Sequence, residues 1–104
     1  MEKRKAHYPL SQIKRLVREG SYRVTRTALD CGRRDFRLSS TMQIAECILN
    51  LEAHEFYKSM TTLYDSRIWQ DVYRSAVGDT GAYITVQIVD GNTVVISFKR
   101  LEEF

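Results

Sequence analysis

The sequence has few of the residues that interrupt or cross-link a chain. Its 104 residues include one proline, five glycines and two cysteines. It contains no linker, low-complexity segment or internal repeat, so we predict one domain over residues 1–104. Hydrophobic residues make up 43% of the chain and charged residues 28%, which is typical of a globular protein.

Long hydrophobic runs are also absent. No stretch approaches the roughly 18 apolar residues that cross a bilayer. The N-terminus, M-E-K-R-K-A-H-Y, is basic, but no apolar segment follows it as in a secretion signal. We therefore expect a cytoplasmic protein that does not associate with membranes.

Cysteine and histidine are too sparse to suggest a metal site. Cys31 and Cys47 do not have the C-x-x-C spacing, and the two histidines, His7 and His54, do not complete a zinc set. We expect both cysteines to be free thiols in a reducing compartment. The sequence also lacks a P-loop, a dinucleotide fingerprint and an H-E-x-x-H motif, so we predict neither metal nor cofactor.

Positive charge is concentrated in the first third of the chain, although the net charge is only +3. Residues 1–37 carry eleven Lys or Arg against four Asp or Glu, whereas residues 38–104 carry five against nine. A basic surface of this kind attracts phosphate backbones, although the same residues could form an ordinary solvated face.

The first half of the chain has the apolar spacing of helices. A helix begins at Pro9-Leu10-Ser11, with Ser11 as its cap, and ends at Gly20. After a short strand over residues 22–24, a second helix runs from its Thr25 cap to Gly32, before a basic loop at residues 33–37. Ser40 and Gln43 form a capping box. That box opens a third helix whose apolar stripe is Ile44, Cys47, Ile48 and Leu51.

From residue 56 onward, the apolar period changes from 3.6 to 2, which is typical of strands. The predicted strands are 56–64, 69–77, 82–89 and 93–100. Helices followed by a meander of strands make an α+β fold. We expect the helices to cover one face of an antiparallel sheet and to leave the other face open.

The last hairpin has a predictable register. If Asp90-Gly91-Asn92 is a three-residue loop, Ile84 faces Phe98, Ile88 faces Val94 and Tyr83 faces Lys99. The apolar sets Ile84, Val86, Ile88 and Val94, Ile96, Phe98 would then point to the core. Tyr83, Thr85, Gln87, Ser97 and Lys99 would lie on the open face, with Tyr83 directly across from Lys99.

Several long strings resemble the MqsR-type toxins of bacterial toxin–antitoxin modules. They are M-E-K-R (1–4), L-S-Q-I-K-R-L-V (10–17), T-R-T-A-L (25–29), F-Y-K-S-M-T-T (56–62), I-W-Q-D-V-Y-R (68–74) and S-F-K (97–99). The resemblance covers nearly the whole chain and implies a RelE-like fold, with a twisted antiparallel sheet of four or more strands and N-terminal helices on one face. It also implies a sequence-specific endoribonuclease that acts on messenger RNA.

The resemblance implies four catalytic residues, Lys58, Gln70, Tyr83 and Lys99. For contacts to RNA we assign Tyr57, Met60 and Arg74. Trp69 is expected in the core, and Tyr73 in packing or base stacking. The family often has a lysine two places after the hairpin tyrosine, where this chain has Thr85.

The implied reaction needs no metal, because the 2′-hydroxyl of the RNA attacks the adjacent phosphate and leaves a 2′,3′-cyclic phosphate. Lys58 and Lys99 would stabilise the phosphorane, and Tyr83 is a candidate acid or base. Neighbouring ammonium groups lower one another's pKa, so one lysine could transfer a proton near neutral pH. Gln70 would orient the phosphate or a base.

The expected partners are single-stranded mRNA and an antitoxin that carries a zinc-bearing domain and a helix-turn-helix domain. DNA would be contacted only through that antitoxin. Two alternatives remain open at this point. One is a non-catalytic module that binds RNA or the ribosome through its basic half. The other is an interaction protein whose sheet edge accepts a partner strand.

Overall fold

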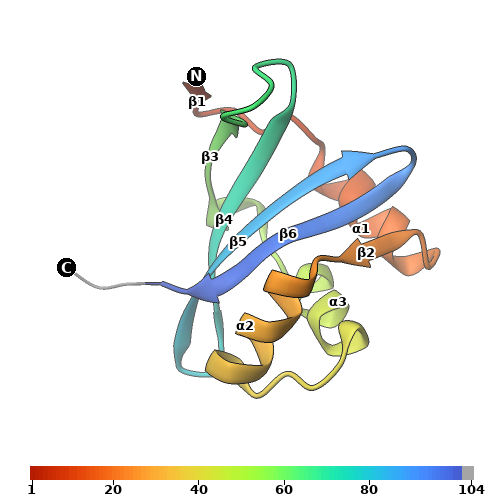
Figure 1. Ribbon diagram of the computed structural model, residues 1–104, viewed down its shortest axis with the longest axis vertical. Helices are drawn as coiled ribbons and strands as arrows, with labels where there is room; N and C mark the ends of the chain where they lie inside the picture. The colour runs from red at the N-terminus through yellow and green to blue at the C-terminus, as the bar shows by residue number, and fades with distance from the viewer. Residues whose placement is uncertain (102–104) are drawn as a thin grey trace.

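The computed structural model describes residues 1–101, which contain three α-helices and a six-stranded sheet (Figure 1). The strands lie in the order β1-β3-β4-β5-β6-β2. In chain order the elements are β1 (Glu2–Lys3), α1 (Leu10–Arg18), β2 (Tyr22–Val24), α2 (Arg26–Phe36), α3 (Thr41–Leu49), the 3₁₀ turn η1 (Ala53–Glu55), β3 (Phe56–Thr61), β4 (Trp69–Val77), β5 (Thr80–Val89) and β6 (Asn92–Arg100).

The predicted meander is present as β3 to β6, and the α+β class is confirmed. The sheet is nevertheless mixed, because β2 pairs with β6 in parallel. The first predicted strand is too long, since β3 ends at Thr61 and residues 62–68 form a loop. Leu63 and Tyr64 in that loop are almost completely exposed.

The core lies between the three helices and one face of the sheet. In Figure 1 the helices gather on the same side of the strands. Buried side chains from both layers form one cluster, namely Ile13, Val17, Ala28, Phe36, Ile44, Ala45, Ile48, Leu51, Tyr73, Ala82, Ile84, Val86, Val95 and Phe98. Among residues 1–101, no helix of this layer lies on the opposite face of the sheet.

The helix starts are mostly as predicted. The side chains of Thr25 and Ser40 accept hydrogen bonds from the backbone N–H groups of Ala28 and Gln43, so both N-caps are confirmed. The Ser11 cap is wrong, because Pro9 occupies the N-cap position and Ser11 lies inside the first turn. The carbonyl of Pro9 accepts the first hydrogen bonds of α1.

The predicted end of the second helix is also wrong. Gly32 does not stop α2, which continues to Phe36 and ends at Arg37 in the left-handed conformation. Gly32 is buried against α3, and a Cβ atom there would lie 3.1 Å from Cδ1 of Ile44. This glycine therefore permits close packing of two helices, and most of the expected basic loop is the last turn of α2.

The last hairpin has a two-residue loop rather than the predicted three-residue loop. Asp90 and Gly91 both have positive φ values, 50° and 74°, as a type I′ turn requires. Val89 therefore pairs with Asn92, and Ile88 pairs with Thr93 rather than with Val94. A register shift after Thr85 then restores the predicted pairs further along the hairpin.

The register shift changes which β6 side chains reach the core. Val95 and Phe98 belong to the core cluster, whereas Val94 and Ile96 do not. Val94 pairs with Gln87 instead and lines a shallow hollow on that side of the sheet. The prediction that Val94, Ile96 and Phe98 share the core face is therefore wrong for the first two.

Both cysteines are free thiols, as predicted. Cys47 is half-buried and packs against the core cluster, and this burial raises the pKa of its thiol. A thiol with a raised pKa is a weak nucleophile at neutral pH, so Cys47 serves as a small packing residue.

The N-terminal segment is tied to the helix-covered side of the sheet by one buried carboxylate. Asp71 on β4 is fully buried and accepts hydrogen bonds from the backbone N–H groups of His7, at 3.1 Å, and Tyr8, at 2.9 Å. The hydroxyl of Tyr8 donates to the carbonyl of Trp69 at 2.8 Å. These bonds hold residues 7 and 8 against β4.

Replacing Asp71 by asparagine should lower the free energy of unfolding by about 1–3 kcal/mol, because the amide N–H₂ would face a backbone donor. Urea denaturation measures this loss, and hydrogen exchange at the His7 and Tyr8 amides should accelerate. Asp79→Asn, in an exposed turn, is the matched control. Equal stability of the two variants would show that the buried carboxylate does not anchor the segment.

Candidate active site

The four predicted catalytic residues lie on one face of the sheet, each on a different strand. Tyr83 pairs with Lys99, and Lys58 pairs with Val72, which in turn pairs with Thr85. Paired residues on neighbouring strands point to the same face, and so do residues two places apart on one strand. Lys58, Val72 and Thr85 therefore define one face of the sheet. Lys58, Gln70, Tyr83 and Lys99 all lie on this face, which is opposite to the core cluster.

Tyr83 and Lys99 are in direct contact. The Nζ atom of Lys99 lies 5.1 Å from the centroid of the Tyr83 ring, within the range of a cation–π interaction. On its other side, Tyr83 pairs with Arg74 on β4. Arg74, Tyr83 and Lys99 therefore form a row across three strands in which two cations flank a phenol.

Lys58 is held by a carboxylate that was not predicted. Its Nζ atom donates to Oε2 of Glu2 at 3.0 Å, and its side chain is only 17% exposed. The hydrogen bond to Glu2 raises the pKa of Lys58, and the bond to Lys58 lowers the pKa of Glu2. The expectation that neighbouring lysines lower the pKa is therefore wrong for Lys58, whose pKa is raised.

Gln70 lies at the far end of the face from the Tyr83–Lys99 pair. Its side-chain amide donates to Oε1 of Gln87 on β5 at 3.2 Å. Gln70 also lines a hollow of about 610 Å³ with Met60 and the loop residues Leu63 and Tyr64. The structure thus places Gln70 on the same face as the other three, beside Met60 rather than beside Lys99.

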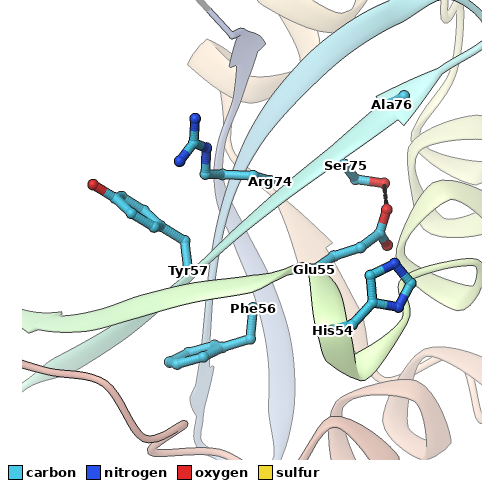
Figure 2. A pocket seen from close by; sticks show the side chains of 7 residues that line it. All are labelled: His54, Glu55, Phe56, Tyr57, Arg74, Ser75 and Ala76. Atoms are coloured by element: carbon cyan, nitrogen blue, oxygen red, sulfur yellow. Dashed lines mark hydrogen bonds between the residues drawn. The ribbon is translucent and has the colours of Figure 1, made fainter.

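Tyr57 and Arg74 meet at the other end of β3. The Arg74 guanidinium lies 4.8 Å from the Tyr57 ring centroid, and that of Arg4 lies 5.4 Å from it. Figure 2 shows Tyr57 and Arg74 extending in the same direction at the rim of a hollow of about 490 Å³. A register shift between Phe56 and Lys58 makes Tyr57 the extra residue of a bulge.

Two aromatic residues of the I-W-Q-D-V-Y-R string lie away from this face. Tyr73 is buried in the core against Phe56, and burial raises the pKa of its hydroxyl to about 12, so its predicted packing role is confirmed. Trp69 is not a core residue, contrary to prediction. Its ring stacks on the His7 ring, with the two centroids 5.6 Å apart, and the Lys3 Nζ atom lies 4.1 Å from the Trp69 centroid.

Comparison with known proteins identifies the family of this chain. Residues 5–100 match the model of the family described as motility quorum-sensing regulator, toxin of MqsA. The chain is 40% identical to the mRNA interferase toxin MqsR of Escherichia coli (strain K12), over 96% of this chain and 99% of that protein. The chain belongs to the MqsR toxin family.

In this MqsR-family chain, alternation along β5 correctly placed Gln87 on the open face, but its contact with Gln70 was not predicted. Glu2 and Arg4 were missed, because each reaches β3 from more than fifty positions away in the sequence. Thr85, at the position where the resemblance led us to look for a lysine, is an uncharged residue and only 3% exposed.

The MqsR-family chain has no evident metal site in its described part. Among residues 1–101, no group of three His, Cys, Asp or Glu side chains could hold a metal ion. Within the same residues, none of the helices is long and apolar enough to cross a bilayer.

Proposed function

We propose that this protein is the toxin of a toxin–antitoxin pair and that it cleaves messenger RNA on the open face of its sheet. The observation that carries the proposal is the cationic face on which Lys58, Tyr83 and Lys99 lie together. The name of the Escherichia coli relative, an mRNA interferase toxin, supports it.

The proposed reaction uses the RNA as its own nucleophile. The 2′-oxygen attacks the adjacent phosphorus, and the bond to the 5′-oxygen breaks. The products are a 2′,3′-cyclic phosphate and a free 5′-hydroxyl. One enzyme group must accept the proton of the 2′-hydroxyl, and another must deliver a proton to the leaving oxygen. Because the RNA supplies the nucleophile, a metal-activated water is not required.

Lys58 and Lys99 would stabilise the additional negative charge of the phosphorane. The hydrogen bond to Glu2 raises the pKa of Lys58, which favours an electrostatic role over that of a base. Tyr83 and Lys99, which touch one another, are the candidates for accepting the proton of the 2′-hydroxyl. Strands β3 and β6, which carry the two lysines, are three places apart in the sheet and so about 14 Å apart at the backbone, a gap that two lysines and a phosphate can bridge.

RNA recognition would use the residues at the two ends of β3. Tyr57, already stacked by Arg74, offers a ring to an unpaired base, and the guanidinium offers hydrogen bonds to phosphate. Met60 and Gln70 line the second hollow, where Gln70 can contact a base edge or orient the phosphate. Single-stranded mRNA would therefore run along β3.

The protein partner would be the cognate antitoxin. We expect it to carry a zinc-bearing domain and a helix-turn-helix domain, so that DNA is contacted only through the antitoxin. A toxin of this kind acts in the cytoplasm, where its mRNA substrate is found.

A cleavage assay tests the proposal. Purified protein should cut labelled single-stranded RNA in the presence of EDTA, and Lys58→Ala should slow cutting about 10²–10³-fold because a phosphorane-stabilising cation is lost. Lys14→Ala on α1, on the helix side, is the matched control. RNA that is bound but stays intact would favour the non-catalytic RNA- or ribosome-binding module. Cutting that survives Lys58→Ala would exclude this site.

A further inference from the structure

The N-terminal strand delivers a carboxylate to the proposed active site. We propose that Glu2 is a positioning residue that holds the Lys58 ammonium in place for the scissile phosphate, and that residues 1–8 form a strap whose task is to hold Glu2 there. The inference rests on the proposed role of Lys58 in RNA cleavage. Glu2 would not take part in making or breaking bonds and would act only through Lys58.

The register of β1 explains how Glu2 reaches Lys58. Glu2 pairs with Met60 and Lys3 pairs with Ser59, so Glu2 lies on the same face as Met60 and therefore as Lys58. Glu2 and Lys58 are diagonal neighbours, which long side chains can bridge. Their charged atoms meet at 3.0 Å.

This ion pair differs from an ordinary surface pair in its burial. The side chain of Lys58 is 17% exposed, whereas that of Glu2 is 56% exposed. A lysine stem has four flexible bonds, and an untethered ammonium loses that freedom only when substrate arrives. The bond to Glu2 removes this freedom before RNA binds, which is how a positioned group accelerates a reaction.

The ammonium of Lys58 remains available to substrate. It has three N–H donors, and Glu2 engages it through one carboxylate oxygen. The remaining donors can address a phosphate on the open face. The ionisable groups around Lys58 are Glu2 on β1, Tyr57 on β3 and Tyr83 on β5. Glu2 is the carboxylate among them, and its hydrogen bond is the main reason that the pKa of Lys58 is raised.

The strap is fastened on both sides of Glu2. Before it, the backbone carbonyl of Met1 accepts a hydrogen bond from the Thr61 N–H at 2.9 Å. After it, Lys3 lies over the Trp69 ring on the other face, and Asp71 binds the backbone at His7 and Tyr8. A two-residue strand would fray alone, so these contacts keep Glu2 beside Lys58.

The test replaces Glu2 by glutamine, which keeps the size and the acceptor oxygen and removes the charge. In a single-turnover and steady-state assay on labelled RNA, we expect kcat to fall about tenfold with little change in KM, as for loss of one charge-assisted hydrogen bond. Glu19→Gln is the matched control. It also removes a carboxylate from an ion pair, with Arg15, but lies at the end of α1.

A direct measurement separates positioning from a structural role. In protein labelled at lysine Cε, the NMR signal of Lys58, assigned by its loss in Lys58→Arg, should titrate at lower pH in Glu2→Gln than in wild type. The Lys14 signal should not move. Hydrogen exchange at the Thr61 amide should be unchanged, which reports that β1 is still paired.

Three results would overturn the inference while leaving the proposed function intact. In Glu2→Gln, they are an unchanged kcat, an increased kcat, and a Lys58 titration at the same pH as in wild type. In each case the Lys58→Ala variant would still be inactive. Accelerated exchange at Thr61 with an unshifted Lys58 titration would reduce Glu2 to a strand-pairing residue. Full activity of Lys58→Ala would instead contradict the proposed function.

Discussion

Replacing Lys99 by alanine should slow RNA cleavage about 10²–10⁴-fold, the usual effect of losing a proton-transfer partner. The Nζ atom of Lys99 lies over the Tyr83 ring on the open face, so its loss removes a charge from the phosphorane and a neighbour from the phenol. Lys99 is exposed, and the free energy of unfolding should change by less than about 0.5 kcal/mol.

The measurement is the single-turnover rate of cleavage of a labelled RNA, with urea denaturation of the same samples. Arg100→Ala is the control, because Arg100 is the next exposed cation on β6 and pairs with Ala82 of the core-facing row. Activity of Lys99→Ala within a few-fold of the control would remove Lys99 from the catalytic set.

Replacing Phe98 by alanine should lower the free energy of unfolding by about 3–5 kcal/mol, the usual effect of a large-to-small change in a core. Phe98 is fully buried, pairs with Ile84 and meets the Phe36 ring edge-on at 5.1 Å. Its removal would leave a cavity between β6 and α2. A loss of this size is a large part of the total stability of a small domain.

Urea denaturation measures this effect, and Lys99→Ala is the matched control because the two residues are adjacent on one strand and point to opposite faces. At low temperature, where the Phe98→Ala variant remains folded, it should still cut RNA because Phe98 points away from the open face. A destabilisation below about 1 kcal/mol, the range of ordinary surface changes, would contradict the placement of Phe98 in the core.

The sequence was sufficient for features that depend on neighbours along the chain. The caps at Thr25 and Ser40 and the order of the four strands of the meander were predicted correctly, although the first strand was predicted too long, because caps and alternation are local. The Tyr83–Lys99 pair was also correct, although the loop length was wrong. The shorter Asp90-Gly91 turn and the register shift after Thr85 cancel along the hairpin.

For the candidate site, reasoning from residue patterns alone predicted that Tyr83 and Lys99 share a face, and it predicted no other pair. Lys58 and Gln70 were assigned to the site by the resemblance to the MqsR-type toxins. Alternation alone identifies them only as polar residues on a solvent-exposed strand face. The sheet register then placed them on the face of Tyr83 and Lys99. Their catalytic roles remain predictions that the substitutions above test.

Tertiary structure alone decided the features that join distant segments. Gly32 lies inside a helix at its close contact with α3, and Trp69 packs against His7 and Lys3 rather than in the core cluster. Glu2 reaches Lys58 because β1 pairs with the end of β3. Local propensity and alternation determine which face a side chain takes, but a contact between segments depends on how the whole chain buries its core.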